Sequence, residues 1–428
     1  MKYIGGKWRE SGFKRYLKSA SWSMSSRLFS MVISFVATTY IARSLGPTNF
    51  GQLSYALSFV SIFSFIASLG IDGILYRELI KTPEKRNQLL GSALFIKLCA
   101  GSIAGITCII SALFFTTDDV SMILIFILTG TFIFNSFQII NHEFQARLDA
   151  KYPAIINVSV VIILNILKIF SIITGKGVIY LSLILLLESI LYALFYFLAY
   201  EIKLKEKVSA WKIKTETVIS LLKDSWPLIF STAFILIYSR IDQIFIKHII
   251  DAKAVGVYDS AVRIAEVWYI IPNVLVTALF PAIISAKKIS EDTYNNRLGK
   301  FVLLLLALSL IISIPISIFA PLIIKILYGS DFLSGVIVLQ IYIWASMGVF
   351  LGTLVTNYLI AENYKKILFF TSLLPMLVNV LLNITWIPEY GITGAAYATL
   401  ISYMLLPLSI LFFRQTRTRV IQIFKLMI

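Results

Sequence analysis

Long apolar runs alternate with short polar connections along the whole chain. A run of about twenty mostly apolar residues is long enough to cross a bilayer as a helix. Twelve such runs are found, at 21–41, 50–72, 89–115, 120–141, 154–174, 178–200, 226–250, 255–281, 300–320, 335–358, 367–387 and 393–413. Pro315, Pro321 and the polar stretch "YGSDFLSG" make the ninth and tenth runs the hardest to bound. The pattern predicts an all-α integral membrane protein with twelve transmembrane helices.

The charges in the connections support the same number. The two termini and the even-numbered connections hold 28 of the 38 Lys and Arg residues, and the odd-numbered connections hold five. By the positive-inside rule, both termini are expected in the cytoplasm. An odd number of spans would remove this difference in positive charge between the two sides of the membrane. The topology also explains the net charge of +16, so no nucleic-acid partner is needed.

The composition agrees with a bilayer environment. Apolar residues make up 58% of the chain and charged residues only 14%, against about 25% charged in soluble proteins. The two cysteines, Cys99 and Cys108, share one apolar run and are expected to be small apolar residues rather than a disulfide. No Cys or His spacing indicates a metal, and no cofactor is expected. The first apolar run follows a basic N-terminus but is too long for a signal peptide, so we interpret it as a retained span.

The chain reads as two six-span halves, 1–200 and 226–428, joined by a Lys-rich cytoplasmic linker at 201–225. "GPTNFGQLSYALSF" (46–59) and "IDAKAVGVYDSAVRI" (250–264) each connect the first two spans of a half, and Gly51 matches Gly256 at an offset of 205. Both halves begin on the same side, which indicates a parallel repeat. Gly46-Pro47 predicts a turn, and Gly51 predicts a close approach to a neighbouring helix.

These stretches carry a family resemblance. "ARSLGPTNFGQLSYA" (42–56), "YSRIDQIFI" (238–246) and "AVGVYDSAVRIAEVW" (254–268) resemble the polysaccharide biosynthesis, or O-antigen flippase (Wzx-type), family. That family belongs to the multidrug/oligosaccharidyl-lipid/polysaccharide (MOP) exporter superfamily. The resemblance implies two six-helix lobes around a central cavity, as in MATE transporters, that opens alternately to each side. It implies an undecaprenyl-diphosphate-linked oligosaccharide as cargo, moved from the cytoplasmic to the outer leaflet of the inner membrane, with membrane lipids and glycan polymerase machinery as partners.

Five cations lie inside the predicted spans, where a charge is costly and usually faces a cavity or a partner. They form a cationic ladder through the membrane when depth is taken as about 1.5 Å per residue: Arg27, Lys97, Lys168, Arg240 and Arg263. A wet cavity lined with Arg and Lys would stabilise a diphosphate, so the five are predicted to bind the cargo. The alternatives are internal ion pairs, such as Lys168 with Glu188 or Arg263 with Glu266 or Asp242, and snorkelling of Arg27 and Lys97 to the inner surface.

Acidic residues in the spans are candidates for coupling transport to H⁺ or Na⁺. Asp242 and Glu266 are the better candidates, since a carboxyl group in a low-dielectric cavity can exchange protons near neutrality. Asp72 is a third, although pairing with Arg77 near the inner surface is the favoured interpretation.

A polar stripe runs along the eleventh span, where Thr371, Pro375, Asn379 and Asn383 recur every four residues. Asn379 and Asn383 face either the sugar of the cargo or, as we favour, neighbouring helices through hydrogen bonds.

Other functions fit less well. A membrane-bound glycan enzyme is disfavoured because the chain has no long outer connection, no Asp-x-Asp pair and no Gly-rich nucleotide loop. A MATE-type multidrug antiporter shares twelve spans, but its cavity should be acidic for cationic drugs. A lipid II flippase would usually have two further spans, and only fifteen residues follow Phe413. Flippases for capsule or teichoic-acid units remain open.

Overall fold

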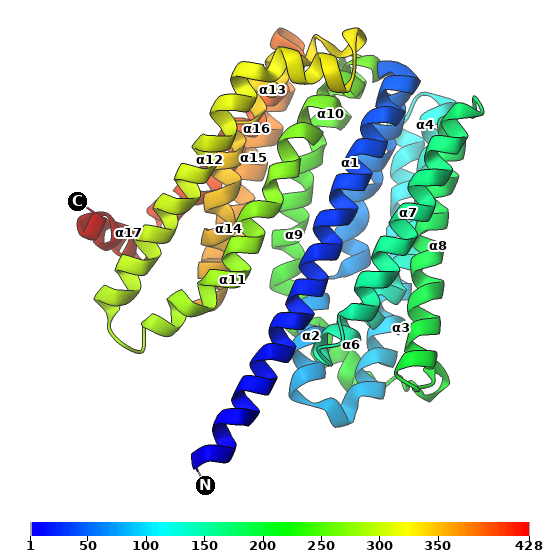
Figure 1. Cartoon of the computed structure of the whole chain (residues 1–428). Coiled ribbons are helices and arrows are strands. Elements are labelled where there is room, and N and C mark those ends of the chain that lie inside the picture. The colour runs from blue at the N-terminus through cyan, green and yellow to red at the C-terminus, as the bar shows by residue number, and fades with distance from the viewer. Residues whose placement is uncertain (1, 428) are drawn as a thin grey trace. The chain divides into compact units, whose positions relative to one another are not determined.

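The computed structural model describes residues 2–427, with side chains described except at 2–17, 224, 226–228, 421 and 423–427. The basic N-terminal residues up to Arg15, and Lys425, therefore lie outside the described side chains. Residues 2–427 form helices and connections, with no strand (Figure 1). Eleven helical segments within the described residues are long and apolar enough to span a membrane. The first, Lys18–Lys81, contains two predicted spans separated by a non-helical Gly46, so the segments account for all twelve.

The chain divides into two compact units. The first comprises Met1–Ser44 with Phe59–Thr232, and the second comprises Leu45–Ser58 with Ala233–Ile428. The division near residue 232 lies close to the predicted linker. The short segment Leu45–Ser58, by contrast, packs with the second unit although its neighbours on both sides belong to the first.

The first unit is built from the helices before the linker. Their order is α1 (Lys2–Ser68), α2 (Asp72–Lys81), η1 (Pro83–Lys85), α3 (Arg86–Phe115), α4 (Asp119–Thr129), α5 (Thr131–Phe134), η2 (Asn135–Gln138), α6 (Ile139–Ala146), α7 (Lys151–Ile173) and α8 (Val178–Lys203). The predicted fourth span is thus broken into four short helices. Its first begins where the Asp118 side chain accepts a hydrogen bond from the Ser121 amide, a standard N-cap. The core includes Leu75, Leu90, Phe144 and Tyr200.

The predicted linker, 201–225, is part of the first unit and packs against its other helices. After η3 (Val208–Ala210), the Trp211 indole donates to the Tyr200 hydroxyl at 2.9 Å, and the Lys212 amide donates to the Asn87 carbonyl at 3.0 Å. A Cβ on Gly91 would lie 2.7 Å from the Lys212 carbonyl oxygen, so only glycine permits this approach. α9 (Thr215–Ile249) then begins inside the predicted linker range.

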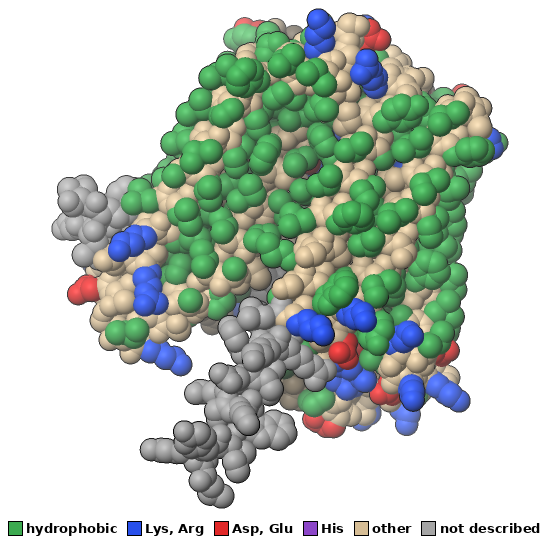
Figure 2. Space-filling view, in the orientation of Figure 1, with side chains coloured by type: hydrophobic (Ala, Val, Ile, Leu, Met, Phe, Trp, Pro, Cys, Tyr) green, Lys and Arg blue, Asp and Glu red, His purple; other side chains and the backbone are tan. Residues whose placement is uncertain are grey.

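The second unit contains the remaining helices. They are α10 (Ala252–Glu266), η4 (Val267–Tyr269), α11 (Ile270–Ala286), α12 (Glu291–Leu327), η5 (Ser330–Phe332), α13 (Gly335–Tyr342), α14 (Ala345–Ala361), α15 (Lys365–Tyr390), α16 (Ile392–Ser409), η6 (Ile410–Phe412) and α17 (Arg414–Met427). α12 continues through Pro315 and Pro321, which do not end it. In each unit hydrophobic side chains cover the flanks of the helices, while Lys and Arg gather near the helix ends (Figure 2), as expected for spans in lipid.

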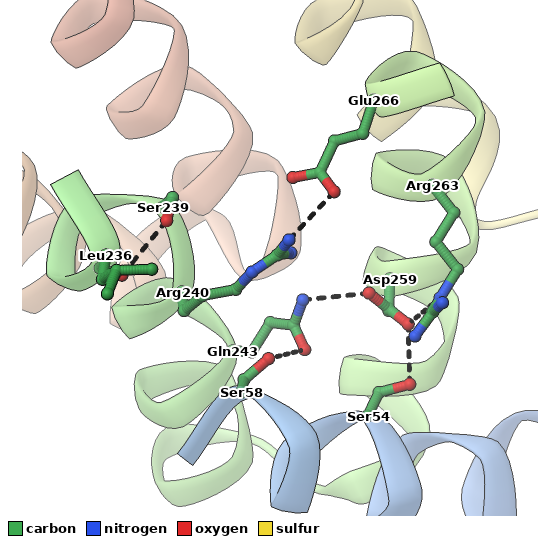
Figure 3. Close-up of polar contacts among 9 residues, drawn as sticks. All are labelled: Ser54, Ser58, Leu236, Ser239, Arg240, Gln243, Asp259, Arg263 and Glu266. Carbon is green, nitrogen blue, oxygen red and sulfur yellow. Dashed lines mark hydrogen bonds and ion pairs between the residues drawn. The ribbon is translucent and has the colours of Figure 1, made fainter. Parts of the chain in front are cut away.

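Two segments with equivalent places in the sequence repeat contact each other in the second unit. A Cβ on Gly51 would lie 1.7 Å from the Ala252 carbonyl oxygen, and a Cβ on Gly256 would lie 2.0 Å from the Pro47 carbonyl oxygen. The Ser54 hydroxyl donates to Asp259 at 2.7 Å, a pair again 205 positions apart (Figure 3). The close approach predicted for Gly51 is confirmed, and the turn predicted at Gly46 occurs there at a φ of 72°.

Candidate cargo-binding site

Four members of the cationic ladder are ion-paired with carboxylates. The pairs are Lys97 with Asp72 at 2.5 Å, Lys168 with Glu188 at 3.1 Å, Arg240 with Glu266 at 3.0 Å and Arg263 with Asp259 at 2.6 Å. Arg27 alone of the five has no carboxylate partner among the described side chains. The ladder is therefore largely neutralised within the protein, and the excess positive charge is concentrated at Arg27.

The pairing of Asp72 differs from the expectation. Asp72 contacts Lys97 and His142, the latter at 3.2 Å, whereas Arg77 contacts Glu78 at 3.0 Å. Lys97 is only 6% exposed, so it does not snorkel to the surface. Sequence distance favoured Arg77, but the fold brings α3 and α6 against the start of α2.

The ion pairs of Lys168, Arg240 and Arg263 are only partly those expected from sequence. The Lys168–Glu188 pair in the first unit is confirmed, but Arg263 pairs with Asp259 four residues earlier rather than with Glu266 or Asp242. Glu266 instead reaches Arg240 on α9 (Figure 3). The short α9–α10 connection makes these helices neighbours, so partners on different helices compete with partners on the same face. The Arg263 guanidinium also lies 5.4 Å from the centre of the Phe50 ring.

Arg27 lines a cavity of about 270 Å³ in the first unit. Helices α1, α6, α7 and α8 contribute to it together with η2. The described residues that line it are mostly polar and include no carboxylate: Ser23, Ser26, Arg27, Gln138, Asn141, Gln145, Pro153, Ala154, Asn157, Tyr192 and Tyr196. We call this the Arg27 cavity. A single cation surrounded by amides and hydroxyls is suited to an anionic group attached to a polyhydroxylated one.

Three amides of this cavity lie on consecutive turns of the broken fourth span. Gln138, Asn141 and Gln145 recur at intervals of three and four residues, which places them on one helical face. We call them the amide row. The sequence interpretation missed them, although the amides of "NSFQIINHEFQ" (135–145) are unusually frequent for a span and their spacing was readable.

A fourth amide holds the opposite wall in place. Asn157 on α7 donates to the Ser30 hydroxyl at 2.9 Å and accepts from the Tyr192 hydroxyl at 2.7 Å. It also donates to the Ser26 carbonyl on α1 at 3.4 Å. These bonds connect α1, α7 and α8, so the wall beside Arg27 is preorganised.

The second unit contains a separate cavity of about 530 Å³ between α9, α10, α11, α14 and α16. The Arg240–Glu266 pair lines it, and so do Tyr238, Tyr269 and Tyr403. The rings of Tyr238 and Tyr269 each meet Tyr403 edge to face, at 5.2 and 6.2 Å between centroids. Within the part of the chain whose side chains are described, its one acidic lining residue is the ion-paired Glu266.

Asp242 is buried differently from the other acids. It is 1% exposed and accepts hydrogen bonds from the Tyr258 hydroxyl, from Thr399 at 3.2 Å and from the Gln243 amide at 2.9 Å. No described cation forms an ion pair with it. A buried carboxyl group held only by neutral donors is a suitable site for exchanging a cation or proton.

The polar stripe of α15 is inside the protein. Asn379 and Asn383 are fully buried, and the Asn383 amide donates to the Asn379 side chain at 3.0 Å. Neither residue lines the Arg27 cavity or the cavity of the second unit. The two amides therefore bond to each other within α15, and Asn379 Nδ2 and Asn383 Oδ1 form no hydrogen bond among the described residues. The favoured hydrogen bonds to neighbouring helices are not found among these residues.

The polysaccharide biosynthesis protein family model matches residues 16–287 of this chain. The chain belongs to this family, within the MOP superfamily. The family model of the lipid II flippase MurJ matches residues 153–428. The match to MurJ was not favoured by the span count, and it shows that the chain from α7 onward shares features of that family too.

Relatives and solved structures agree with this membership. The chain is 23% identical over 387 residues to the probable low-salt glycan biosynthesis flippase Agl15 of Haloferax volcanii, covering 88% of this chain and 79% of Agl15. It is 27% identical over 179 residues to the probable flippase AglR of the same organism, covering 39% of this chain and only 36% of AglR.

Among solved structures, an inward-facing multidrug resistance MATE family transporter of the MOP superfamily matches with a TM-score of 0.77 at 15% identity, over 92% of this chain and 96% of that one. The lipid II flippase MurJ, in an inward closed conformation, matches with a TM-score of 0.70 at 17% identity, over 95% and 90%. At these identities the likeness establishes the fold and leaves the cargo open.

Proposed function

We propose that this protein is a flippase that carries a lipid-linked glycan across the membrane, and that it holds the cargo through its diphosphate. The observation that carries the proposal is Arg27, the one ladder cation without a carboxylate partner among the described side chains, in a cavity lined by amides and hydroxyls. A diphosphate cannot cross hydrocarbon unaided, because an unpaired charge there costs many kcal/mol. A guanidinium can bind phosphate oxygens through two parallel hydrogen bonds.

The lining of the two cavities argues against a cationic drug as cargo. No acidic side chain is found among the described residues that line the Arg27 cavity, and Glu266 in the second cavity is already paired with Arg240. A cationic compound would meet Arg27 without a compensating carboxylate. The fold itself does not decide, since both a multidrug transporter and a lipid II flippase share it.

The finer assignment follows from the family resemblance. The proposed cargo is an O-antigen repeat unit on undecaprenyl diphosphate, moved by alternating access from the cytoplasmic to the outer leaflet of the inner membrane, with both termini cytoplasmic. Capsule and teichoic-acid units carried on polyprenyl diphosphate would present the same group to Arg27.

The remaining predicted residues take different parts in this proposal. Arg240 lines the second cavity and is retained as a cargo contact. Lys97, Lys168 and Arg263 instead stabilise the helices through ion pairs with their carboxylate partners. The coupling candidates are Asp242, Glu266 and Asp72. We favour Asp242 for H⁺ or Na⁺ exchange, because the other two carboxylates are already paired with Arg or Lys side chains.

Reconstitution of the full chain into proteoliposomes tests the proposal. A fluorescent polyprenyl-diphosphate oligosaccharide is placed in both leaflets, and dithionite reports the fraction that reaches the outside. We expect the protein to move the diphosphate lipid to the outer leaflet and to transport neither fluorescent phosphatidylcholine nor a cationic dye. Transport of the dye with no movement of the diphosphate lipid would refute the proposal.

A further inference from the structure

The amide row, Gln138, Asn141 and Gln145, lies in the same cavity as Arg27 and carries no positive charge to pair with a phosphate. We infer that it recognises the sugar ring joined to the diphosphate, and that it selects rings with neutral substituents, hydroxyl or N-acetyl, over rings with a free amine. The inference rests on the proposed function and extends it to the class of sugar.

The hydrogen bonds inside the row leave complementary atoms for a ligand. The Gln145 amide donates to Asn141 Oδ1 at 3.1 Å, and the Gln138 amide donates to Asn135 Oδ1 at 3.0 Å. No other bond is formed within the described side chains by Asn141 Nδ2, Gln138 Oε1 or Gln145 Oε1. The row thus offers the two N–H groups of Asn141 and two amide oxygens, and a sugar hydroxyl or N-acetyl group can both give and accept such bonds.

The size of the cavity limits the ligand. At about 270 Å³ it lies just below the roughly 300–1,000 Å³ of small-molecule sites. That volume suits one sugar ring and its phosphate rather than a whole oligosaccharide. The fixed wall of Asn157 and Tyr192 opposes adjustment to a larger ligand.

The charge of the cavity sets the preference among sugars. Arg27 is the only charged side chain among the described residues that line it. An ammonium group on the ring would be repelled by Arg27 and would find no carboxylate, whereas an N-acetyl group is neutral and matches the amides. A cavity built to hydrogen-bond a polar group discriminates strongly against a ligand that leaves its amides unpaired.

Binding of three lipids to the purified full chain tests this. The probes are polyprenyl diphosphate alone, the same lipid with N-acetylglucosamine, and the same lipid with glucosamine. We expect the N-acetylglucosamine lipid to bind at least about tenfold more tightly than either of the others. The double variant Asn141→Leu/Gln145→Leu should remove this advantage and leave the affinity for the sugar-free lipid unchanged.

Two controls keep the result decisive. Asn296→Leu replaces an exposed amide of α12, outside both cavities, and should retain the wild-type preference. If the double variant fails to fold, Gln138→Leu tests the same row from another turn. Equal binding of all three lipids by the wild type would overturn the inference but not the flippase, whereas failure to bind any diphosphate lipid would overturn the proposed function itself.

Discussion

Replacing Gly51 with alanine should break the contact between segment 45–58 and α10. The added Cβ would lie 1.7 Å from the Ala252 carbonyl oxygen, whereas Cβ atoms essentially never come closer than 3.0 Å. The helix must therefore retreat by the difference, about 1.3 Å. That movement stretches the hydrogen bonds from Ser54 to Asp259 and from Ser58 to Gln243, both 2.7 Å long.

The cost can be assembled from these contacts. Overpacking costs about 1–3 kcal/mol. The bond to the Asp259 carboxylate contributes about 1.5–3 kcal/mol, and the neutral bond to Gln243 about 0.5–1.5 kcal/mol. The higher helix propensity of alanine offsets this destabilisation by about 1 kcal/mol. The contact should weaken by about 2–6 kcal/mol in total.

Hydrogen–deuterium exchange of peptides covering 47–58 measures this weakening directly. In Gly51→Ala we expect protection to fall by about 25-fold or more. The matched control is Gly105→Ala in α3, where a Cβ would meet nothing within 4 Å and the change should be neutral or slightly stabilising. Unchanged protection at 47–58 in Gly51→Ala would refute the backbone contact on which the estimate depends.

Two further predictions concern ion pairs of the first unit. Glu143 is fully buried and pairs with Arg86 at 2.7 Å and with Arg147, so Glu143→Gln should destabilise the protein by about 3–5 kcal/mol and lower its melting temperature by about 6 °C or more. The control Glu84→Gln, at an exposed position, should leave the melting temperature unchanged. A Glu143→Gln variant as stable as the wild type would contradict the pairing. Lys168→Ala should destabilise the protein because it leaves Glu188 without its cation. If the pair is structural, the double variant Lys168→Ala/Glu188→Ala should recover both stability and transport. A stable double variant that still fails to transport would instead place Lys168 in cargo binding.

The positions of the spans were largely readable from sequence. Hydrophobic run length and the charge contrast of the connections are local or global properties of the chain, and neither depends on which helices meet. The turn at Gly46 and the close approach at Gly51 were readable for the same reason, since only glycine suits those backbone positions. Helix boundaries were less accurate at α12, because two prolines within it are accommodated.

The partners of the charged residues were not readable in the same way. Lys97 pairs with Asp72, and Arg240 pairs with Glu266, because their helices pack against each other. Residue spacing along the chain does not encode which helices pack together. The amide row was overlooked for another reason. Neutral amides in a span cost less than charges, so a search for buried charge passes over them.

The rate of translocation in Arg27→Gln tests the central claim most directly. In proteoliposomes containing the polyprenyl-diphosphate oligosaccharide, loss of a charge-assisted bond worth about 1.5–3 kcal/mol predicts transport slower by about 10- to 100-fold at limiting cargo. Lys325→Gln, an exposed cation at the end of α12, should transport as the wild type does. Wild-type rates in Arg27→Gln would contradict the account, since the diphosphate would then be held elsewhere.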